Sequence, residues 1–219
     1  MLINFRIQNT PFNQYFTTEF VGPETLTPAE KAIVERAVPQ RVKQFSTGRF
    51  CAKQALQALG ITNAEILQGD GKKPLWPADT VGSISHSKSM AGAVVAPADK
   101  LVSIGMDIET IGGVRPDMWD MLYRPSERAY LANYTGDALA LQTTILFSGK
   151  EAFYKFQYPL TKTFLDFTDV EMILVNGQFQ LRVIMDFPGK EVLPHTIRIH
   201  HTLIDNQVIT LCYLEQSEL

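Results

Sequence analysis

Apolar residues recur at helical spacing in the first 60 residues of the chain. Thr27-Pro28-Ala29-Glu30 combines a capping residue, a proline suited to the first helical position and a glutamate that completes a capping box, so a helix is predicted to begin here. A second, longer helix is predicted after Pro39. It runs to Gly60, because a glycine readily adopts the left-handed conformation that ends helices. Its apolar face consists of Val42, Phe45, Ala52, Leu56 and Leu59.

Strict alternation of side chains predicts a strand over residues 102–108. Ile104, Met106 and Ile108 share one face of this strand. Gly105, Asp107 and Glu109 share the other face. Two shorter strands are predicted before it, at 81–85 and 91–96.

Helices and then two hairpins are predicted in the rest of the chain. The helices cover residues 126–132 and 142–157. The strands 170–175 and 179–185 flank Asn176-Gly177, a strong signal for a two-residue turn. The strands 195–204 and 207–214 flank Asp205-Asn206.

A faint internal repeat suggests duplication. Phe45-Ser46 and Lys53 recur 102 residues later as Phe147-Ser148 and Lys155. A chance match of three positions stays open as the alternative. A duplication predicts an α+β fold of two similar lobes with a cleft between them. We expect the first lobe to comprise residues 1–103 and the second to comprise residues 104–219.

Composition and charge exclude several classes of protein. The 219 residues are 45% hydrophobic, which is too apolar for a disordered chain and suits one large or two small domains. With 20 Lys+Arg against 23 Asp+Glu, the net charge of −3 excludes a generic nucleic-acid binder, so any phosphate recognition must be local. No apolar run is long enough to span a membrane, and we do not expect residues 1–16 to form a signal peptide. Cys51 and Cys212 match no disulfide or zinc framework, so we expect a reduced, cytoplasmic protein.

Three carboxylates are candidate metal ligands. Asp107 and Glu109 project from one strand face, and two carboxylates placed together repel unless a cation lies between them. Hard oxygen ligands without a nearby cysteine suit Mg²⁺ or Mn²⁺ better than zinc. Glu151 on the later helix could complete the set, with Lys155 four residues away on the same face. A solvated strand end and an exposed helical ion pair stay open as alternatives.

Polar and basic residues offer candidate phosphate contacts. Ser85 and His86 follow a strand, where hydroxyls and an imidazole can donate to phosphate, although a polar turn that satisfies its own backbone stays open. The candidate anion-binding residues are Arg41, Arg49, Lys53, Lys72 and Lys73. Scattered basic residues of this kind also occur on ordinary surfaces.

Five segments in a fixed order carry a resemblance to a known family. They are RVKQFSTGRFCAKQAL (Arg41–Leu56), the loop GDGKKPLWP, then GSISHS, IGMDIE and FSGKEAFYK. Together they resemble the phosphopantetheinyl transferases, in particular the two-lobed type that activates surfactin and enterobactin synthetases. The resemblance covers Arg41 to Lys155 and implies a duplicated α+β fold with coenzyme A held between the lobes.

The resemblance implies a role for each candidate. The implied Mg²⁺ ligands are Asp107, Glu109 and Glu151. The implied coenzyme A contacts are Arg41, Arg49, Lys72 or Lys73, Ser85, His86, Lys150 and Lys155. Glu151, Lys155 and His86 are the implied catalytic residues. Phe147, where many relatives have Trp, and Gly149, where a bulkier residue is common, imply altered packing rather than lost chemistry.

The implied reaction is displacement at phosphorus. A serine hydroxyl of an apo carrier protein attacks the pantetheine-side phosphate of coenzyme A, and adenosine 3′,5′-bisphosphate leaves. A coenzyme A-binding regulatory module without transfer activity and a metal-dependent phosphohydrolase are the alternatives. We expect a monomer without nucleic-acid or membrane partners, with the carrier docking near Met118–Tyr134, although these residues could equally pack onto the core.

Overall fold

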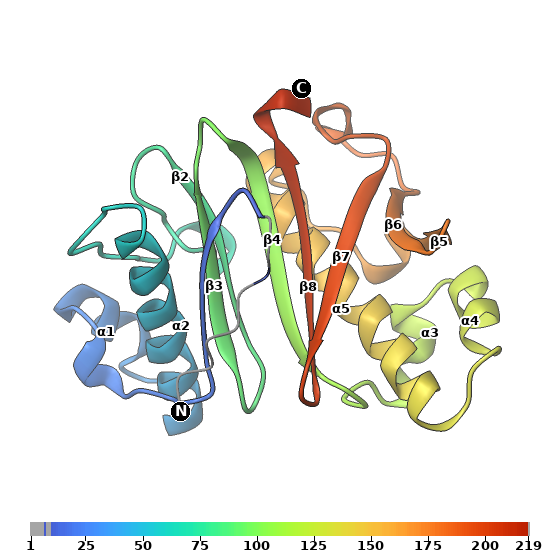
Figure 1. The fold of residues 1–219 in the computed structure, drawn as a ribbon, viewed down its shortest axis with the longest axis horizontal. Helices are drawn as coiled ribbons and strands as arrows, with labels where there is room; N and C mark the ends of the chain where they lie inside the picture. Colours follow the sequence, from blue (N-terminus) through green and yellow to red (C-terminus); the bar gives the residue numbers. More distant parts are fainter. Residues whose placement is uncertain (1–6, 8–9, 219) are drawn as a thin grey trace. The chain divides into compact units, whose positions relative to one another are not determined.

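A computed structural model of the protein describes residue 7 and residues 10–218 (Figure 1). The segment 1–16, for which no signal peptide is predicted, lies partly outside these residues. The described chain divides into two compact units, one containing the residues up to Ile104 and from Leu214 onward, the other containing Gly105–Tyr213. The division between residues 103 and 104 predicted from the sequence lies close to this boundary. It assigns the last residues of the chain to the second lobe, whereas the structure groups them with the first unit.

The first unit is a three-stranded antiparallel sheet, in the order β1-β3-β2, with helix α2 packed on it (Figure 1). Its elements are β1 (Asn13–Thr17), α1 (Pro28–Val34), α2 (Pro39–Gln57), β2 (Thr80–His86) and β3 (Ala91–Pro97). Small and aliphatic residues allow the close helix–sheet contact, and the buried set is Cys51, Ala52, Ala55 and Leu56 with Ala91, Ala93 and Val95.

Both helices predicted in this unit are confirmed. The Thr27 side chain accepts a hydrogen bond from the Glu30 N–H, and the Glu30 carboxylate accepts one from the Thr27 N–H, which closes the capping box. Helix α2 begins at Pro39, one residue before the predicted start, and ends at Gln57, before the predicted end at Gly60. Gly60, which follows, has a φ of +79° and so turns the chain where most residues would be strained.

The second unit contains a five-stranded sheet in the order β4-β8-β7-β6-β5. Its elements are β4 (Leu101–Thr110), α3 (Trp119–Leu122), α4 (Pro125–Leu131), α5 (Gly136–Thr161), β5 (Val170–Val175), β6 (Gln178–Val183), β7 (Ile197–Ile204) and β8 (Gln207–Glu215). Asn176 and Gly177 both have positive φ, at +51° and +79°, as a two-residue hairpin turn requires. Both predicted hairpins are therefore confirmed.

Helix α5 lies directly against the polar face of β4. A Cβ atom added at Gly105 would come within 1.9 Å of the Ala152 carbonyl oxygen, so this glycine lets the backbones of strand and helix meet. The helix is longer than predicted and passes through Pro159. It ends at Thr161, and Lys162 then adopts a left-handed conformation.

These elements confirm the predicted α+β class with two antiparallel sheets and packed helices. The predicted position of a ligand between two lobes stays a prediction. Among the described residues, no helix has both the length and the apolar composition needed to cross a membrane.

Candidate active site

The predicted acids of the second unit come from β4 and α5. Asp107 lies on the β4 face that meets the helix, and its side chain is only 5% exposed. Its Oδ1 accepts a hydrogen bond from Lys155 Nζ at 2.7 Å, and its Oδ2 accepts one from Ser148 Oγ at 2.9 Å. Because both carboxylate oxygens have a partner on α5, the orientation of Asp107 is fixed by that helix.

The pKa values of Glu109 and Glu151 are both affected by the charge of Asp107. Burial raises the pKa of Glu109 to about 7, with further upward contributions from the charges of Asp107 and Glu151 and an opposing one from Lys155. Burial also raises the pKa of Glu151, again opposed by Lys155 and assisted by Asp107. The three carboxylates therefore lie close enough to repel one another.

This arrangement fits a divalent cation. Carboxylate oxygens are the ligands that Mg²⁺ and Mn²⁺ prefer, and a cation would offset both the burial and the mutual repulsion that raise the pKa of Glu109 and Glu151. Within the part of the chain that the structure describes, no three such side chains are already gathered at metal-binding distances. The second unit thus supplies the ligand chemistry, and the side chains would have to move to bring the oxygens together around a cation.

The raised pKa of Glu109 predicts that the cation-free protein loses stability as the pH rises. The folded state holds this proton up to about pH 7, whereas an unfolded glutamate releases it near pH 4.3, so the unfolding free energy falls across this window. In EDTA, Glu109→Gln should be more stable than the parent by about 1–2 kcal/mol at pH 8, allowing for solvent screening, with little difference at pH 4.5. Urea titrations at both pH values test this. An equal difference at the two values would contradict it.

In the first unit, the structure brings together two of the predicted phosphate contacts. Arg41 Nη1 on α2 lies 3.1 Å from His86 Nε2 at the end of β2. Ile84, two residues before His86, packs in the cluster beneath α2, so His86 lies on the helix-covered face of the sheet. Ser85 is buried and lies on the opposite face of β2, so it does not join the Arg41–His86 pair.

Arg49 is the most buried of the predicted anion contacts. It is 5% exposed, its Nε donates to the Ile66 carbonyl oxygen at 2.7 Å, and its guanidinium lies 4.3 Å from the centre of the Phe45 ring. Burial lowers its pKa to about 10. Its buried Nη2 finds no hydrogen-bond partner among the described residues. An unmatched donor on a buried cation fits an anionic ligand group.

The other basic candidates of the first unit differ in what they contact. Lys53 Nζ lies 2.6 Å from the fully buried Glu30 carboxylate, so it serves an internal ion pair and not an anion from outside. Lys72 is exposed, and Lys73 is half-buried on the loop that follows the short turn at Asp70–Lys72. A ligand contact by Lys72 or Lys73 stays a prediction.

The implied phosphate contact of Lys150 does not fit its surroundings. The side chain is fully buried, and Nζ donates to the Glu127 carboxylate at 2.7 Å. It also donates to the carbonyl oxygens of Leu122 and Phe167, both at 2.8 Å. An ammonium group has three hydrogens, so every donor of Lys150 is already used inside the protein.

Glu127 is a residue that sequence reasoning missed. It accepts the N–H groups of Arg124 and Met172, each at 2.7 Å, in addition to its bonds with Lys150. The first unit has the same device, since Glu30 accepts the N–H groups of Thr27 and Ile66 and pairs with Lys53. Each glutamate is the third residue of a seven-residue helix that begins with proline. The x-Pro-x-Glu pattern at the start of both helices was the sequence signal that could have identified Glu127.

The internal repeat therefore has a different register from the predicted one. Glu127 and Lys150 each follow their counterparts by 97 residues, so Lys53 corresponds to Lys150 and not to Lys155. The hydroxyls of Thr143 and Thr144 also follow those of Ser46 and Thr47 by 97 residues, and all four bond to a carbonyl oxygen four residues earlier. The predicted offset of 102 residues was wrong because it matched side-chain types and not helix positions.

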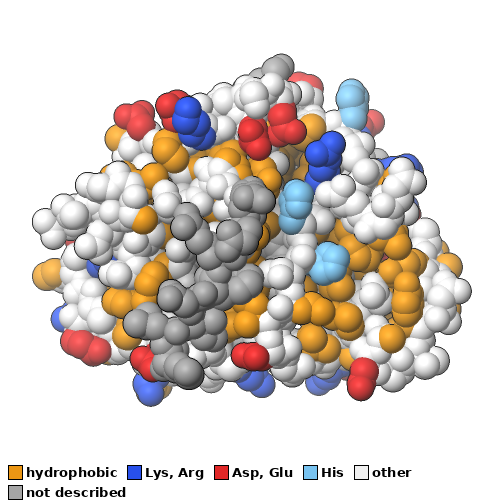
Figure 2. Space-filling model, viewed as in Figure 1, with side chains coloured by type: hydrophobic (Ala, Val, Ile, Leu, Met, Phe, Trp, Pro, Cys, Tyr) orange, Lys and Arg blue, Asp and Glu red, His pale blue; other side chains and the backbone are white. Residues whose placement is uncertain are grey.

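The predicted docking segment divides into exposed and buried parts. Met121 is 62% exposed, whereas Tyr123 is buried and donates a hydrogen bond to the Thr143 carbonyl oxygen. Only part of the segment 118–134 can therefore meet a partner. On the face shown in Figure 2, basic side chains are dispersed among acidic and apolar ones, and no continuous basic surface is visible.

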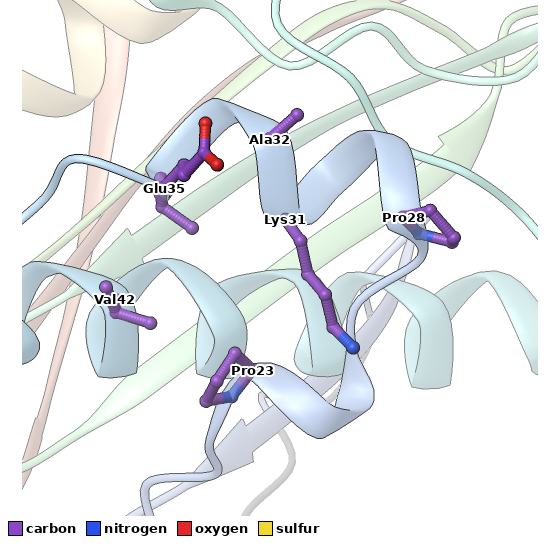
Figure 3. A pocket seen from close by; sticks show the side chains of 7 residues that line it. Pro23, Pro28, Lys31, Ala32, Glu35 and Val42 are labelled. Atoms are coloured by element: carbon purple, nitrogen blue, oxygen red, sulfur yellow. The ribbon is translucent and has the colours of Figure 1, made fainter.

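A surface pocket of about 420 Å³ lies in the first unit, between α1, the turn before it and α2 (Figure 3). It is lined by Pro23, Pro28, Lys31, Ala32, Val34, Glu35 and Val42. None of the predicted site residues is among them, so the pocket is separate from the chemistry described above.

Comparisons with known proteins agree with this arrangement of elements. Residues 29–96 match the model of the 4′-phosphopantetheinyl transferase N-terminal domain, and residues 103–212 match that of the 4′-phosphopantetheinyl transferase superfamily. The first match contains the predicted anion contacts, and the second contains the three acids and α5.

Curated relatives cover most of the chain. A 4′-phosphopantetheinyl transferase of Streptomyces mobaraensis is 38% identical over 74% of this chain and 68% of its own length. A 4′-phosphopantetheinyl transferase of Mycobacterium tuberculosis is 37% identical over 76% of this chain and 77% of its own length. Enterobactin synthase component D of Escherichia coli is 30% identical over 92% of this chain and 91% of its own length. With such relatives and a superfamily match across the second unit, this chain belongs to the 4′-phosphopantetheinyl transferases.

Proposed function

We propose that this enzyme transfers the phosphopantetheine arm of coenzyme A to a serine of an apo acyl, peptidyl or aryl carrier protein. The observation that carries the proposal is the set of three mutually repelling acids beside Lys155, in a chain of this family. We further propose that the reaction needs Mg²⁺, which Mn²⁺ can replace, and that it releases adenosine 3′,5′-bisphosphate.

The proposed step exchanges one phosphorus–oxygen bond for another. The serine Oγ forms a bond to the pantetheine-side phosphorus, and the bond from that phosphorus to the bridging pyrophosphate oxygen breaks. The bridging oxygen leaves with the bisphosphate, and the serine proton passes to a base. Reactions of this type depend mainly on positioning and charge neutralisation.

Asp107, Glu109 and Glu151 would hold the cation. A bound Mg²⁺ neutralises charge on the pyrophosphate oxygens. Glu151 is our candidate for receiving the serine proton. Lys155 pairs with Asp107, and its side chain is 31% exposed, so its ammonium group would be available to neutralise the departing phosphate.

The first unit would bind the nucleotide end of coenzyme A. The unmatched Nη2 of Arg49 supports a phosphate contact. Arg41 and His86 form a basic pair on the helix-covered face of the sheet and offer a second contact. Ser85 and one lysine of the Lys72-Lys73 pair remain proposed contacts. Lys150 is not proposed as one, because its donors are used within the second unit.

The carrier would dock near the exposed part of the segment 118–134, where Met121 presents an apolar side chain. With a net charge of −3, the enzyme offers no overall attraction for an acidic carrier, so local contacts would have to hold it. We propose that the enzyme acts as a monomer.

Intact-mass spectrometry tests the proposed reaction. The enzyme, coenzyme A and Mg²⁺ should add one phosphopantetheine to an apo carrier protein, and EDTA should prevent this by removing the cation. A carrier whose acceptor serine is replaced by alanine is the matched control and should gain no mass. If several unrelated carriers remained unmodified while coenzyme A bound to the enzyme, the regulatory-module alternative would replace this proposal.

A further inference from the structure

The hydroxyl of Ser148 differs from the other buried hydroxyls on α5 in where it points. Those of Thr143 and Thr144 bond to carbonyl oxygens of their own helix, at 2.9 and 2.7 Å. A serine or threonine hydroxyl inside a helix commonly donates to a carbonyl oxygen of the preceding turn in this way. Ser148 Oγ instead reaches across to two strands, to Asp107 Oδ2 at 2.9 Å and to Thr210 Oγ1 at 2.8 Å. All of these side chains are buried.

The direction of the hydrogen bonds follows from the number of protons. Ser148 and Thr210 have one hydroxyl hydrogen each. The ionised Asp107 carboxylate can only accept and forms the stronger, charge-assisted bond, so the Ser148 hydrogen points to it. The Thr210 hydrogen then points to Ser148, either to its carbonyl oxygen at 2.7 Å or to its Oγ. In both cases Thr210 donates to Ser148, and the Ser148 hydroxyl donates to Asp107.

The internal repeat offers an independent comparison. The residue 97 positions before Ser148 is Cys51 on α2, a buried thiol in an otherwise apolar cluster. The first unit thus has a small hydrophobe at this helix position. The hydroxyl occurs in the copy whose neighbouring strand carries a buried carboxylate.

We propose that Ser148 is a positioning residue that holds Asp107 in the orientation needed for a divalent cation, and that Thr210 in turn holds Ser148. This inference rests on the proposed function, because it concerns the cation that Asp107 would bind. Groups that hydrogen-bond to a metal-binding carboxylate fix its direction, and their loss typically weakens metal binding by about 10–100-fold. Replacing Ser148 by alanine removes the hydrogen bond to Asp107 Oδ2 and leaves the bond from Lys155 to Oδ1 in place.

Binding of Mn²⁺, measured by electron paramagnetic resonance of the free ion with coenzyme A present, tests this inference. Ser148→Ala should bind Mn²⁺ about tenfold more weakly than the parent. Thr210→Val, which removes the hydroxyl at nearly constant volume, should have a smaller effect in the same direction, and Thr210→Ser should bind normally. The double variant Ser148→Ala/Thr210→Val should be no weaker than Ser148→Ala, because Thr210 acts through Ser148.

Thr143→Val is the matched control. It removes a buried hydroxyl from the same helix, one that bonds only to carbonyl oxygens of α5 among the contacts described for it, and should leave Mn²⁺ affinity unchanged. Parent-like affinity in Ser148→Ala with a lowered melting temperature would reduce Ser148 to a structural role and overturn the inference. If Ser148→Ala did not fold, parent-like affinity in Thr210→Val would overturn it. A parent enzyme that binds no Mn²⁺ would overturn the metal site itself, and this inference with it.

Discussion

Glu151→Gln is expected to lower phosphopantetheine transfer by at least about a thousandfold while leaving coenzyme A bound. The substitution keeps the shape of a half-buried side chain on α5 but removes both a cation ligand and the proposed proton acceptor. It also removes one of the three repelling charges, so the variant should fold at least as well as the parent. Single-turnover kinetics, with coenzyme A affinity measured separately, checks both statements.

Glu171→Gln is a matched control on the same unit. Glu171 is a half-buried carboxylate on β5, outside the set of three acids, and its replacement should change transfer by less than twofold. Transfer that survives in Glu151→Gln would contradict the proposed role of this acid. Loss of coenzyme A binding together with transfer would instead move Glu151 into the binding machinery.

Lys150→Ala is expected to lower the free energy of unfolding by about 3–5 kcal/mol. Removing one partner of a fully buried ion pair leaves the other charge without compensation, and here Glu127 would lose its only ion-pair partner among the described residues. Two carbonyl acceptors, of Leu122 and Phe167, would also lose their donor. Urea-induced unfolding at neutral pH measures the loss.

The double variant Lys150→Met/Glu127→Leu shows whether the loss comes from the unpaired charge. It should regain part of the stability, because no charge stays buried alone. It should not regain all of it, since the N–H groups of Arg124 and Met172 would lose their acceptor. If Lys150→Ala kept normal stability but bound coenzyme A poorly, Lys150 would be a phosphate contact after all.

The sequence predicts well those features that depend on neighbouring residues. The structure confirms four such local patterns. They are the capping box at Thr27, the proline that begins α2, the hairpin at Asn176-Gly177 and the alternation along β4. The alternation also predicts correctly that Gly105 and Asp107 share a face. In each case a short stretch of chain determines its own conformation.

Features that depend on distant segments could not be predicted in this way. Lys150 follows the same helix spacing whether it meets solvent or the buried carboxylate of Glu127, which lies 23 residues earlier in the chain. The same holds for Ser148, whose partners lie on two other strands. Side-chain type and spacing identify such residues as candidates for function. Only the tertiary structure shows whether a residue bonds to partners inside the protein or is available to contact a ligand.

The register of the repeat shows that the first copy has no counterparts of Glu151 and Lys155. At an offset of 97 residues, Glu151 corresponds to Gln54 and Lys155 corresponds to Ala58. Both copies keep an ion pair between a fully buried glutamate near the start of one helix and a lysine on the next helix. The second unit alone adds the carboxylates, so the shared elements serve the fold and the unshared ones are candidates for function.

Simultaneous measurement of holo-carrier formation and adenosine 3′,5′-bisphosphate release tests the proposed transfer most directly. The enzyme is incubated with coenzyme A and Mg²⁺, with and without an apo carrier protein. Transfer predicts that the two products form in equal amounts, and that no bisphosphate is released without the carrier. Bisphosphate release in the absence of a carrier would contradict it and indicate a phosphohydrolase.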